Sequence, residues 1–356
     1  MKPDRTFLEN MPKIEMHLHL DGAINPEDIW CIAQEYGVTL PHIPEQSLDA
    51  LKTYFQFDDS RDIRTSRDFD HLLRTFDIVI SLMQTPEGLQ DVAETHVRDL
   101  AAQNFVYAET RFAPQYHLRK GLTLEGAIEN TLIGLQRGFE KTGTLVKLIA
   151  CIGRENVTIG PEVARAALKY QDKGVVAIDL ACNEIDYPPE LHVDAFRLTF
   201  GSNLRRCVHA GEVAKTPEKL RQNIITSLID LRADELGHAI LLPDMPEAIE
   251  HVVQLRTRIA SCPLSNLASM VIDDVRDLRL QELLDRNVLV SLHSDDPAMD
   301  HTSLADVFVE TCKAYNFDIN HVQTLSRNAI FGAFCSAKER EWIFEEFRRR
   351  GFDVSS

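Results

Sequence analysis

The sequence predicts an α/β protein built as a closed (β/α)8 barrel of the TIM type, with an inserted helical cap after the first strand. Short runs rich in Val, Ile and Leu alternate with segments of helical periodicity, which is the pattern of βα units around a parallel sheet. Eight such runs are present, as a closed barrel requires. An open doubly wound sheet is the main alternative, but no Gly-rich phosphate loop follows the first run.

The predicted strands are short and evenly distributed along the chain. They cover residues 13–20, 104–113, 144–152, 175–181, 205–210, 235–240, 258–265 and 288–294. The segments between them carry ordinary helix starts, such as Asn25-Pro26 and Thr85-Pro86. The order of strands and helices therefore favours the barrel over other α/β architectures.

The stretch from about residue 38 to 84 is longer than a single βα connection needs. It contains helical periodicity at Phe69, Leu72, Leu73, Phe76, Ile80 and Leu82. We expect an inserted helical cap here, although packing on the outside of the barrel agrees equally well with the pattern.

Length and composition indicate one globular domain over residues 1–356. Hydrophobic residues make up 44% of the chain and charged residues 26%, which is ordinary globular usage. The formal charge of −17 argues against nucleic acids or anionic membranes as partners. No apolar signal core or span is present, and the seven scattered cysteines form no C-x-x-C pair, so we expect a cytoplasmic protein without disulfides. The oligomeric state is left open.

Two histidines in the first predicted strand are candidate metal ligands. His17 and His19 lie two residues apart, so both imidazoles point to the same face of the strand, which in a barrel is the interior. Neutral imidazoles are suitable zinc ligands. An isolated H-x-H is a weak signal by itself, because buried histidines are often hydrogen-bonded core residues.

Further polar residues fall at the ends of later strands. His209 ends the fifth predicted strand, His238 ends the sixth, and Asp295-Asp296 follow the eighth. Active sites of barrel enzymes form at the C-terminal ends of the strands. A third imidazole and a carboxylate would complete a site for a divalent ion, with zinc, iron, cobalt and manganese all compatible with these ligands. The alternative for Asp295-Asp296-Pro297 is a simple turn or helix start.

Taken together, these segments resemble the adenosine and adenine deaminases of the amidohydrolase superfamily. The resemblance rests on an ordered set of motifs that extends over nearly the whole chain. The motifs are His17-Leu18-His19-Leu20-Asp21-Gly22, His209-Ala210-Gly211-Glu212, Gly237-His238 and Ser294-Asp295-Asp296-Pro297, supported by Tyr107–Pro114 and Tyr187–Glu190.

The resemblance implies a role for each matching residue. His17, His19, His209 and Asp295 would bind one zinc ion per chain, because the fourth predicted strand lacks the lysine that two-metal relatives carry there. Glu212, His238 and Asp295 would be catalytic, with Glu212 protonating the purine ring and His238 assisting the attacking water. Substrate-binding roles would fall to His19, Asp21, Cys182 and Asp296.

The same motifs favour a small purine nucleoside as substrate. Asp21, where adenine-specific relatives more often carry glutamate, favours adenosine, and the products would be inosine and ammonia. Adenine and modified adenosines such as aminodeoxyfutalosine are alternatives. Cys182 stands where the family usually has glycine, and Ala239 and His293 also depart from its pattern.

Two other functional classes can be compared with this prediction. A polynucleotide-editing zinc deaminase would carry H-x-E together with P-C-x-x-C, and this pair is absent. A catalytically inactive nucleoside-binding relative is the other alternative, and the presence of every implied ligand together with Glu212 argues against it. Glu212 itself could also be only an acidic residue near a helix N-terminus.

Overall fold

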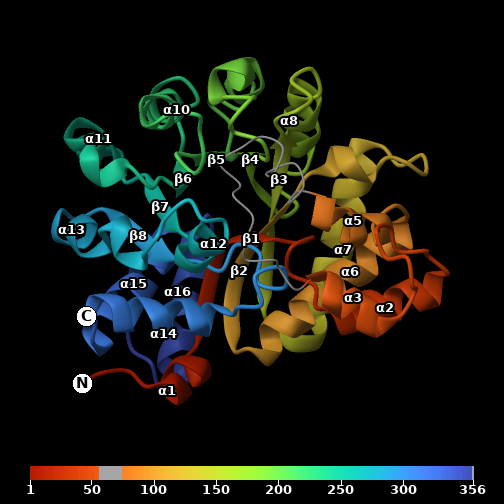
Figure 1. Cartoon of the computed structure of the whole chain (residues 1–356), viewed down its shortest axis with the longest axis horizontal. Helices are drawn as coiled ribbons and strands as arrows, with labels where there is room; N and C mark the ends of the chain where they lie inside the picture. The colour runs from red at the N-terminus through yellow and green to blue at the C-terminus, as the bar shows by residue number, and fades with distance from the viewer. Residues whose placement is uncertain (56–73, 355–356) are drawn as a thin grey trace.

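The computed structural model describes residues 1–55 and 74–354, and its centre is one parallel sheet of eight strands that follow one another in chain order (Figure 1). The strands are β1 (Lys13–His19), β2 (Phe105–Phe112), β3 (Leu145–Gly153), β4 (Val175–Ala181), β5 (Arg205–Ala210), β6 (Glu235–His238), β7 (Arg258–Ser261) and β8 (Leu289–Leu292). Each strand pairs in parallel with the next, so the predicted (β/α)8 barrel is confirmed.

Helices surround the sheet on its outer side (Figure 1). They are α1 (Arg5–Asn10), α2 (Pro26–Tyr36), α3 (Leu48–Phe55), α5 (Asp77–Leu82), α6 (Pro86–Ala102), α7 (Leu124–Thr142), α8 (Gly160–Lys169), α9 (Val193–Arg197), α10 (Pro217–Ile229), α11 (Pro246–Leu255), α12 (Pro263–Ala268), α13 (Leu280–Asp285), α14 (Leu304–Tyr315), α15 (Ile319–Gly332) and α16 (Ala337–Arg349). Both predicted starts are confirmed, because the Asn25 and Thr85 side chains accept backbone N–H groups and a proline follows each.

The barrel closes between β1 and the segment that follows β8. Leu18 forms a parallel bridge with Asp295, in which the backbone N of His19 donates to the carbonyl of Asp295 at 3.0 Å and the N of Asp295 donates to the carbonyl of His17 at 3.1 Å. Closure of the sheet therefore brings both histidines of β1 against Asp295, although 276 residues separate His19 from Asp295 in the sequence.

Three strands end two or more residues earlier than predicted, for local reasons. β6 stops at His238 because His238 and Ala239 have φ angles of 64° and 48°, in the left-handed region. β7 stops at Ser261 because Pro263 begins α12 and lacks the N–H that a further ladder bond would need. β8 ends at Leu292, before Asp295 turns the chain with a φ of 65°.

The long connection after β1 contains helices α3 and α5, as the periodicity at Phe76, Ile80 and Leu82 predicts. The predicted positions Phe69, Leu72 and Leu73 lie outside the described residues. On one side of the molecule, α3 and α5 lie with α2 beside α6 and α7 (Figure 1). Two contacts join the connection to the strand ends. The ring centroids of Phe76 and His19 are 6.4 Å apart, and Nε2 of His301, which follows β8, hydrogen-bonds the carbonyl of Phe55 at 2.8 Å.

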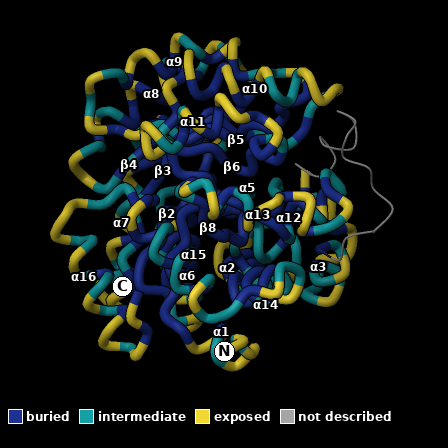
Figure 2. Tube along the Cα trace, turned by 90° about the vertical axis from the view of Figure 1, so that its left-hand side faces the viewer, coloured by how far each residue is buried: buried dark blue, intermediate teal, exposed yellow. Residues whose placement is uncertain are grey.

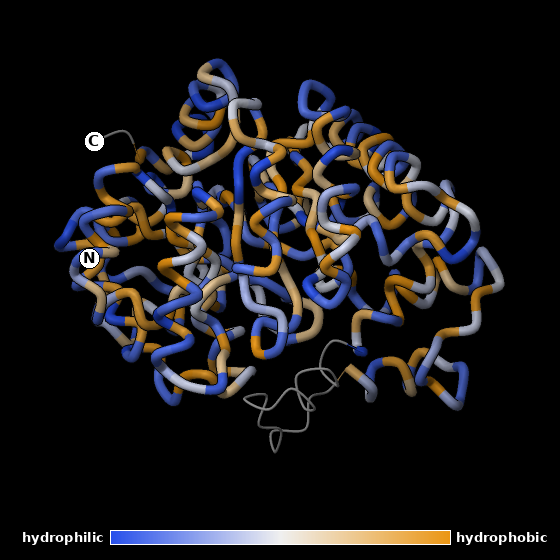
Figure 3. Tube along the Cα trace, turned by 90° about the horizontal axis from the view of Figure 1, so that it is seen from above, coloured by the Kyte–Doolittle hydropathy of each residue, from blue (hydrophilic) through white to orange (hydrophobic). Residues whose placement is uncertain are grey.

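The strands are buried and the exposed residues lie on the outer helices and loops (Figure 2). Hydrophobic and hydrophilic residues alternate along the helices, as expected for helices that pack one face on a barrel (Figure 3). The barrel interior also contains ionisable side chains that are at most 1% exposed, namely Glu15, Glu109, Arg111, Asp179, Glu235 and Arg258. Such groups are stable in a protein interior only when they are paired.

All seven cysteines are free, in agreement with the expected absence of disulfides. Among residues 1–55 and 74–354, no helix is both long and apolar enough to span a bilayer.

Candidate active site and metal centre

Three histidines and one aspartate converge at the C-terminal ends of β1 and β5 and at the seam after β8. Nε2 of His209 lies 3.1 Å from Nε2 of His17 and 3.0 Å from Nε2 of His19. Oδ1 of Asp295 lies 3.3 Å from Nε2 of His17 and 3.4 Å from Nε2 of His19. Donor atoms around a tetrahedral zinc ion are about 3.3 Å apart, given Zn–N distances of 2.0–2.1 Å. The four predicted ligands are therefore spaced as such a site requires.

Buried carboxylates contact two of the imidazole rings at Nδ1, whereas the Nε2 atoms of these rings face the cluster. Nδ1 of His17 lies 3.1 Å from Oε1 of Glu235, and Nδ1 of His209 lies 3.1 Å from Oδ2 of Asp179. Arg111 donates to both carboxylates at 2.9 Å. When Nδ1 carries the proton that a carboxylate accepts, the Nε2 lone pair is directed into the cluster, which is the arrangement of histidine ligands in metal sites.

The charge balance of the cluster suits a divalent ion. Burial lowers the pKa of His209 to about 4 and that of His19 well below its ordinary value, so both rings are neutral. Burial and the Arg111 charge also lower the pKa of His17, but the neighbouring carboxylates of Asp295 and Glu235 outweigh them and raise it to about 9. The cluster thus attracts one positive charge, which a bound metal ion would supply in place of the proton.

Asp295 offers one oxygen to this cluster. Its Oδ2 accepts from the Ser265 hydroxyl at 2.8 Å, whereas its buried Oδ1 has no hydrogen-bond partner among the described residues. A buried carboxylate oxygen without a partner is costly. Its position among three imidazoles fits a ligand that binds a cation.

Glu212 and His238 lie beside the four ligands. Nε2 of His238 is 3.7 Å from Oε2 of Glu212 and 3.8 Å from Oδ2 of Asp295, and its Nδ1 is held by Nδ2 of Asn266 at 3.0 Å. Burial raises the pKa of the Glu212 carboxyl. A raised pKa makes a carboxyl group better suited to act as a general acid.

The three predicted substrate-binding residues that are not metal ligands surround the same region. Asp21 is 6% exposed, and burial raises its pKa to about 7. Burial and the neighbouring Asp295 charge raise the pKa of Asp296, whose side chain lies directly against the backbone of Gly22. A β-carbon at residue 22 would overlap the Asp296 carboxylate, which explains the glycine there.

Cys182 occupies a glycine-like position with a φ of 77°. Its thiol lies 3.6 Å from the hydroxyl of Tyr116, which donates to Glu155 at 2.8 Å. Asn183 donates its backbone N–H to the same carboxylate at 3.1 Å. The departure from glycine therefore places a side chain, and not only backbone, on this side of the site.

The two other departures from the family pattern do not contribute side chains to the cluster. His293 is a buried core histidine, whose Nδ1 lies 2.5 Å from Oε1 of Glu15 and whose Nε2 lies 2.8 Å from the hydroxyl of Ser291. Ala239 continues the backbone turn after His238, donating its N–H to the carbonyl of Ala210 at 3.1 Å.

Several supporting residues were not predicted from the sequence. They are Arg111, Asp179, Glu184, Glu235, Ser265 and Asn266, which hold the ligands or the neighbouring backbone. Arg111, Asp179 and Glu235 are charged residues within apolar strands, and this was the available signal for them. A buried charge requires a partner, so their positions indicate that each forms an ion pair or a hydrogen bond. Sequence alone does not show which partner each one meets.

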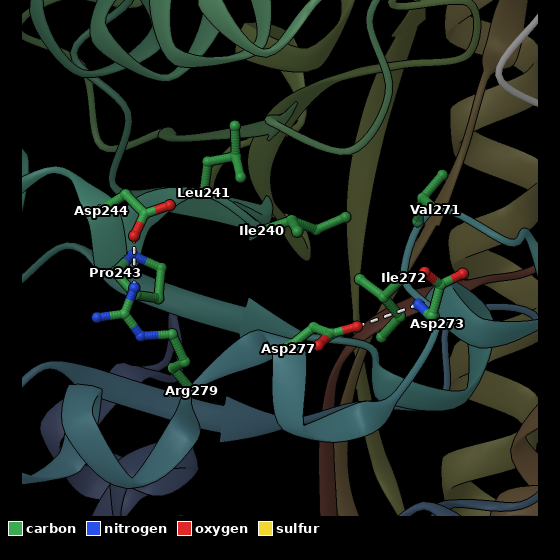
Figure 4. A pocket seen from close by; sticks show the side chains of 9 residues that line it. All are labelled: Ile240, Leu241, Pro243, Asp244, Val271, Ile272, Asp273, Asp277 and Arg279. Atoms are coloured by element: carbon green, nitrogen blue, oxygen red, sulfur yellow. Dashed lines mark hydrogen bonds and ion pairs between the residues drawn. The ribbon is translucent and has the colours of Figure 1, made fainter.

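A pocket of about 220 Å³ lies beside the β6 end of the barrel (Figure 4). Its walls include Ile240, two residues after His238, and Ile272, and an ion pair between Asp244 and Arg279 lies at its edge. None of the predicted site residues lines it, so it is separate from the metal cluster.

An eight-stranded parallel barrel with three imidazoles and an aspartate at its strand ends is the architecture of the metal-dependent amidohydrolases. Within this class the chain belongs to the adenosine deaminase family, whose model matches residues 12–349. Members of this family are hydrolytic deaminases that act on purines.

Curated relatives are similar over nearly the whole chain. The adenosine deaminase of Clostridium kluyveri is 32% identical over 343 residues, which cover 96% of this chain and 94% of the relative. The adenosine deaminase of Enterococcus faecalis is 29% identical and covers 96% of this chain and 97% of the relative.

Solved structures share the fold. The adenine deaminase of Arthrobacter aurescens has a TM-score of 0.80 at 26% identity, covering 95% of this chain and 98% of that one. An amidohydrolase from Burkholderia ambifaria with bound zinc has a TM-score of 0.79 at 21% identity, covering 97% and 93%. An Arabidopsis protein in complex with IMP has a TM-score of 0.80 at 22% identity, covering 96% and 98%.

Proposed function

We propose that this protein deaminates adenosine hydrolytically, converting adenosine and water to inosine and ammonia. The observation that carries the proposal is the convergence of His17, His19, His209 and Asp295 beside Glu212, whose carboxyl pKa is raised. A divalent ion, when bound by these four residues, supplies the Lewis acidity that makes water a nucleophile near neutral pH. We further propose zinc, one ion per chain, and a single domain over residues 1–356.

The residues of the chain have separate tasks in the proposed reaction. Attack of water on the ring carbon that bears the amino group disrupts the aromatic ring, so the adjacent ring nitrogen must gain a proton. Glu212 delivers this proton, because burial raises the pKa of its carboxyl and so favours the protonated form. His238 and Asp295, 3.8 Å apart, orient the attacking water between them.

Binding of the substrate is assigned to residues around the cluster. Asp296 forms a hydrogen bond with the imidazole side of the purine. Burial and the Asp295 charge favour the protonated form of the Asp296 carboxyl, which donates this hydrogen bond. Asp21 reaches a ribose hydroxyl, and His19 and Cys182 also contact the substrate.

Adenine is the second candidate substrate. It is favoured by the similarity to the adenine deaminase of Arthrobacter aurescens. The Cys182 side chain also takes space that a glycine would leave free. Asp21 distinguishes between the two candidate substrates, because adenosine has a ribose hydroxyl for its carboxylate to bind and free adenine has none.

The test is a spectrophotometric assay of the zinc-loaded protein with adenosine, adenine and a thioether nucleoside, with ammonia measured in parallel. We expect adenosine to have the highest kcat/KM, with one ammonia released per inosine formed. Asp21→Ala should reduce the turnover of adenosine and leave that of adenine unchanged. Zinc-loaded protein that deaminates none of these compounds would refute the proposed function.

A further inference from the structure

Glu184 is a buried carboxylate that the proposed reaction does not use. It follows β4, is 1% exposed, and accepts four hydrogen bonds. Its Oε1 accepts from the backbone N of Gly211 and from Nδ2 of Asn223, both at 2.9 Å. Its Oε2 accepts from the backbone N of Glu212 and of Val213, both at 3.1 Å.

Three of these donors are consecutive backbone N–H groups in the turn after β5. Gly211 has a φ of 77°, which glycine adopts without strain, and this conformation directs successive N–H groups toward one point. Such a concave group of N–H donors binds an anion. Here the anion is the Glu184 side chain, which comes from the neighbouring strand end.

The turn held in this way carries the proposed acid. The Glu212 carboxyl makes no hydrogen bond to the described part of the chain, and Nε2 of the His238 imidazole lies 3.7 Å from its Oε2. The position of this carboxyl is therefore set by its backbone. That backbone is fixed by Glu184 on one side and, on the other, by the N–H of Ile240, which donates to the carbonyl of Gly211 at 3.0 Å.

No lysine, arginine or histidine in residues 1–55 and 74–354 forms an ion pair with Glu184. The nearby Arg154 instead donates to the carbonyls of Tyr187 and His209. Glutamine would fill the same space, but its amide nitrogen would meet at least one N–H donor instead of accepting from it. The site is thus specific for a carboxylate.

We propose that Glu184 is the positioning residue for Glu212, fixing the turn 211–213 so that the acid meets the purine ring. This inference rests on the proposed role of Glu212 in deamination. Loss of the carboxylate should lower kcat much more than it changes KM, because the four hydrogen bonds of Glu184 go to Gly211, Glu212, Val213 and Asn223 and to none of the proposed metal ligands or substrate-binding residues. A displacement of about 1 Å in a reacting group costs about 10²-fold in rate.

The test compares zinc-loaded Glu184→Gln, Glu184→Asp and Ser336→Ala with wild type. Ser336 is the control, because it caps α16 by accepting a hydrogen bond from the backbone N–H of Glu339 at 3.2 Å and is not one of the site residues. Loss of this cap should lower the stability of the protein only. We expect Glu184→Gln to retain zinc and a KM within about 3-fold of wild type while kcat falls about 10²-fold. Glu184→Asp, which keeps the charge on a shorter side chain, should recover part of kcat. Ser336→Ala should lower Tm and leave kcat unchanged.

Amide hydrogen exchange at Gly211, Glu212 and Val213 provides a readout that does not depend on activity. These N–H groups should be protected in wild type and exchange faster in Glu184→Gln, while amides of β3 stay protected in both.

A kcat within 3-fold of wild type in Glu184→Gln, or a loss of kcat that only follows loss of zinc, would overturn the inference. If Glu184→Gln does not fold, Glu184→Asp provides the same comparison. Absence of purine deamination by wild type would refute the proposed function instead, and unchanged exchange at 211–213 would refute the turn's dependence on Glu184.

Discussion

Gly237 on β6 gives a quantitative test of the metal centre. A β-carbon at this position would lie 2.5 Å from Cε1, 3.2 Å from Nδ1 and 3.4 Å from Nε2 of His17. Carbon atoms in contact are about 3.5 Å apart, so Gly237→Ala requires the ring or the strand to move by about 1 Å. Nε2 of His17 also lies 3.1 Å from Nε2 of His209, which leaves the ring little room.

A displacement of this size exceeds what a metal ligand tolerates. Metal–ligand distances in well-formed sites agree within about 0.2 Å, and loss of a group that merely supports a ligand costs about 10- to 100-fold in affinity. We therefore expect Gly237→Ala to weaken zinc binding by about 10²-fold or more, which corresponds to about 2.7 kcal/mol. Competition with a chromophoric zinc chelator measures this change, and circular dichroism verifies that the variant is folded.

Gly126→Ala is the matched control. Gly126 lies in α7, where a β-carbon would meet the Thr123 hydroxyl at 3.3 Å and the Leu122 side chain at 3.5 Å. Alanine is favoured over glycine within a helix by about 0.5–1 kcal/mol, so this variant should be at least as stable as wild type and bind zinc equally well. Gly237→Ala protein that binds zinc within 3-fold of wild type would refute the proposed packing of His17 against β6.

Three further predictions concern the acid, the support of a ligand, and pH. Glu212→Gln should retain zinc and lower kcat by about 10²- to 10⁴-fold, as loss of a general acid does, and a kcat near that of wild type would exclude the role. Asp179→Asn should weaken zinc binding about 10- to 100-fold through the His209 ring, measured by the same chelator competition, and an unchanged affinity would contradict this support. Burial and the Asp28 charge raise the pKa of Asp99 from 3.8 to about 6, so the folded chain holds this proton more tightly than the unfolded chain, and the group lowers stability as pH rises from 4 to 6. The free energy of unfolding in urea should therefore be higher for Asp99→Asn than for wild type, and this difference should be larger at pH 7 than at pH 4. An equal difference at both pH values would contradict the prediction.

The fold could be predicted because its signal is local. Buried parallel strands require apolar runs, and each of the eight runs formed a strand. Strand ends were less accurate, because the left-handed φ of Ala239 depends on the turn that it completes and Pro263 starts a helix inside a run of apolar residues. The periodicity of the insertion predicted α5, but not the contact of Phe76 with His19, which is set by tertiary packing.

The convergence of the candidate ligands followed from the same pattern, because the C-terminal ends of barrel strands meet on one side. The supporting residues could not be predicted in this way. Arg111 joins Asp179 of β4 to Glu235 of β6, and this pairing depends on side-chain reach across the barrel interior, which no spacing in the sequence encodes. Glu184 is similar, because its partners are backbone N–H groups of a turn that exists only in the folded chain.

The central claim is that purine deamination depends on a metal ion held by His17, His19, His209 and Asp295. Metal-depleted protein titrated with zinc, with bound metal and inosine formation measured on the same samples, tests it most directly. We predict that activity rises in proportion to bound zinc and reaches its plateau at one ion per chain, and that His209→Ala shows neither tight binding nor activity. Full activity in metal-depleted wild type, or in His209→Ala, would contradict the account.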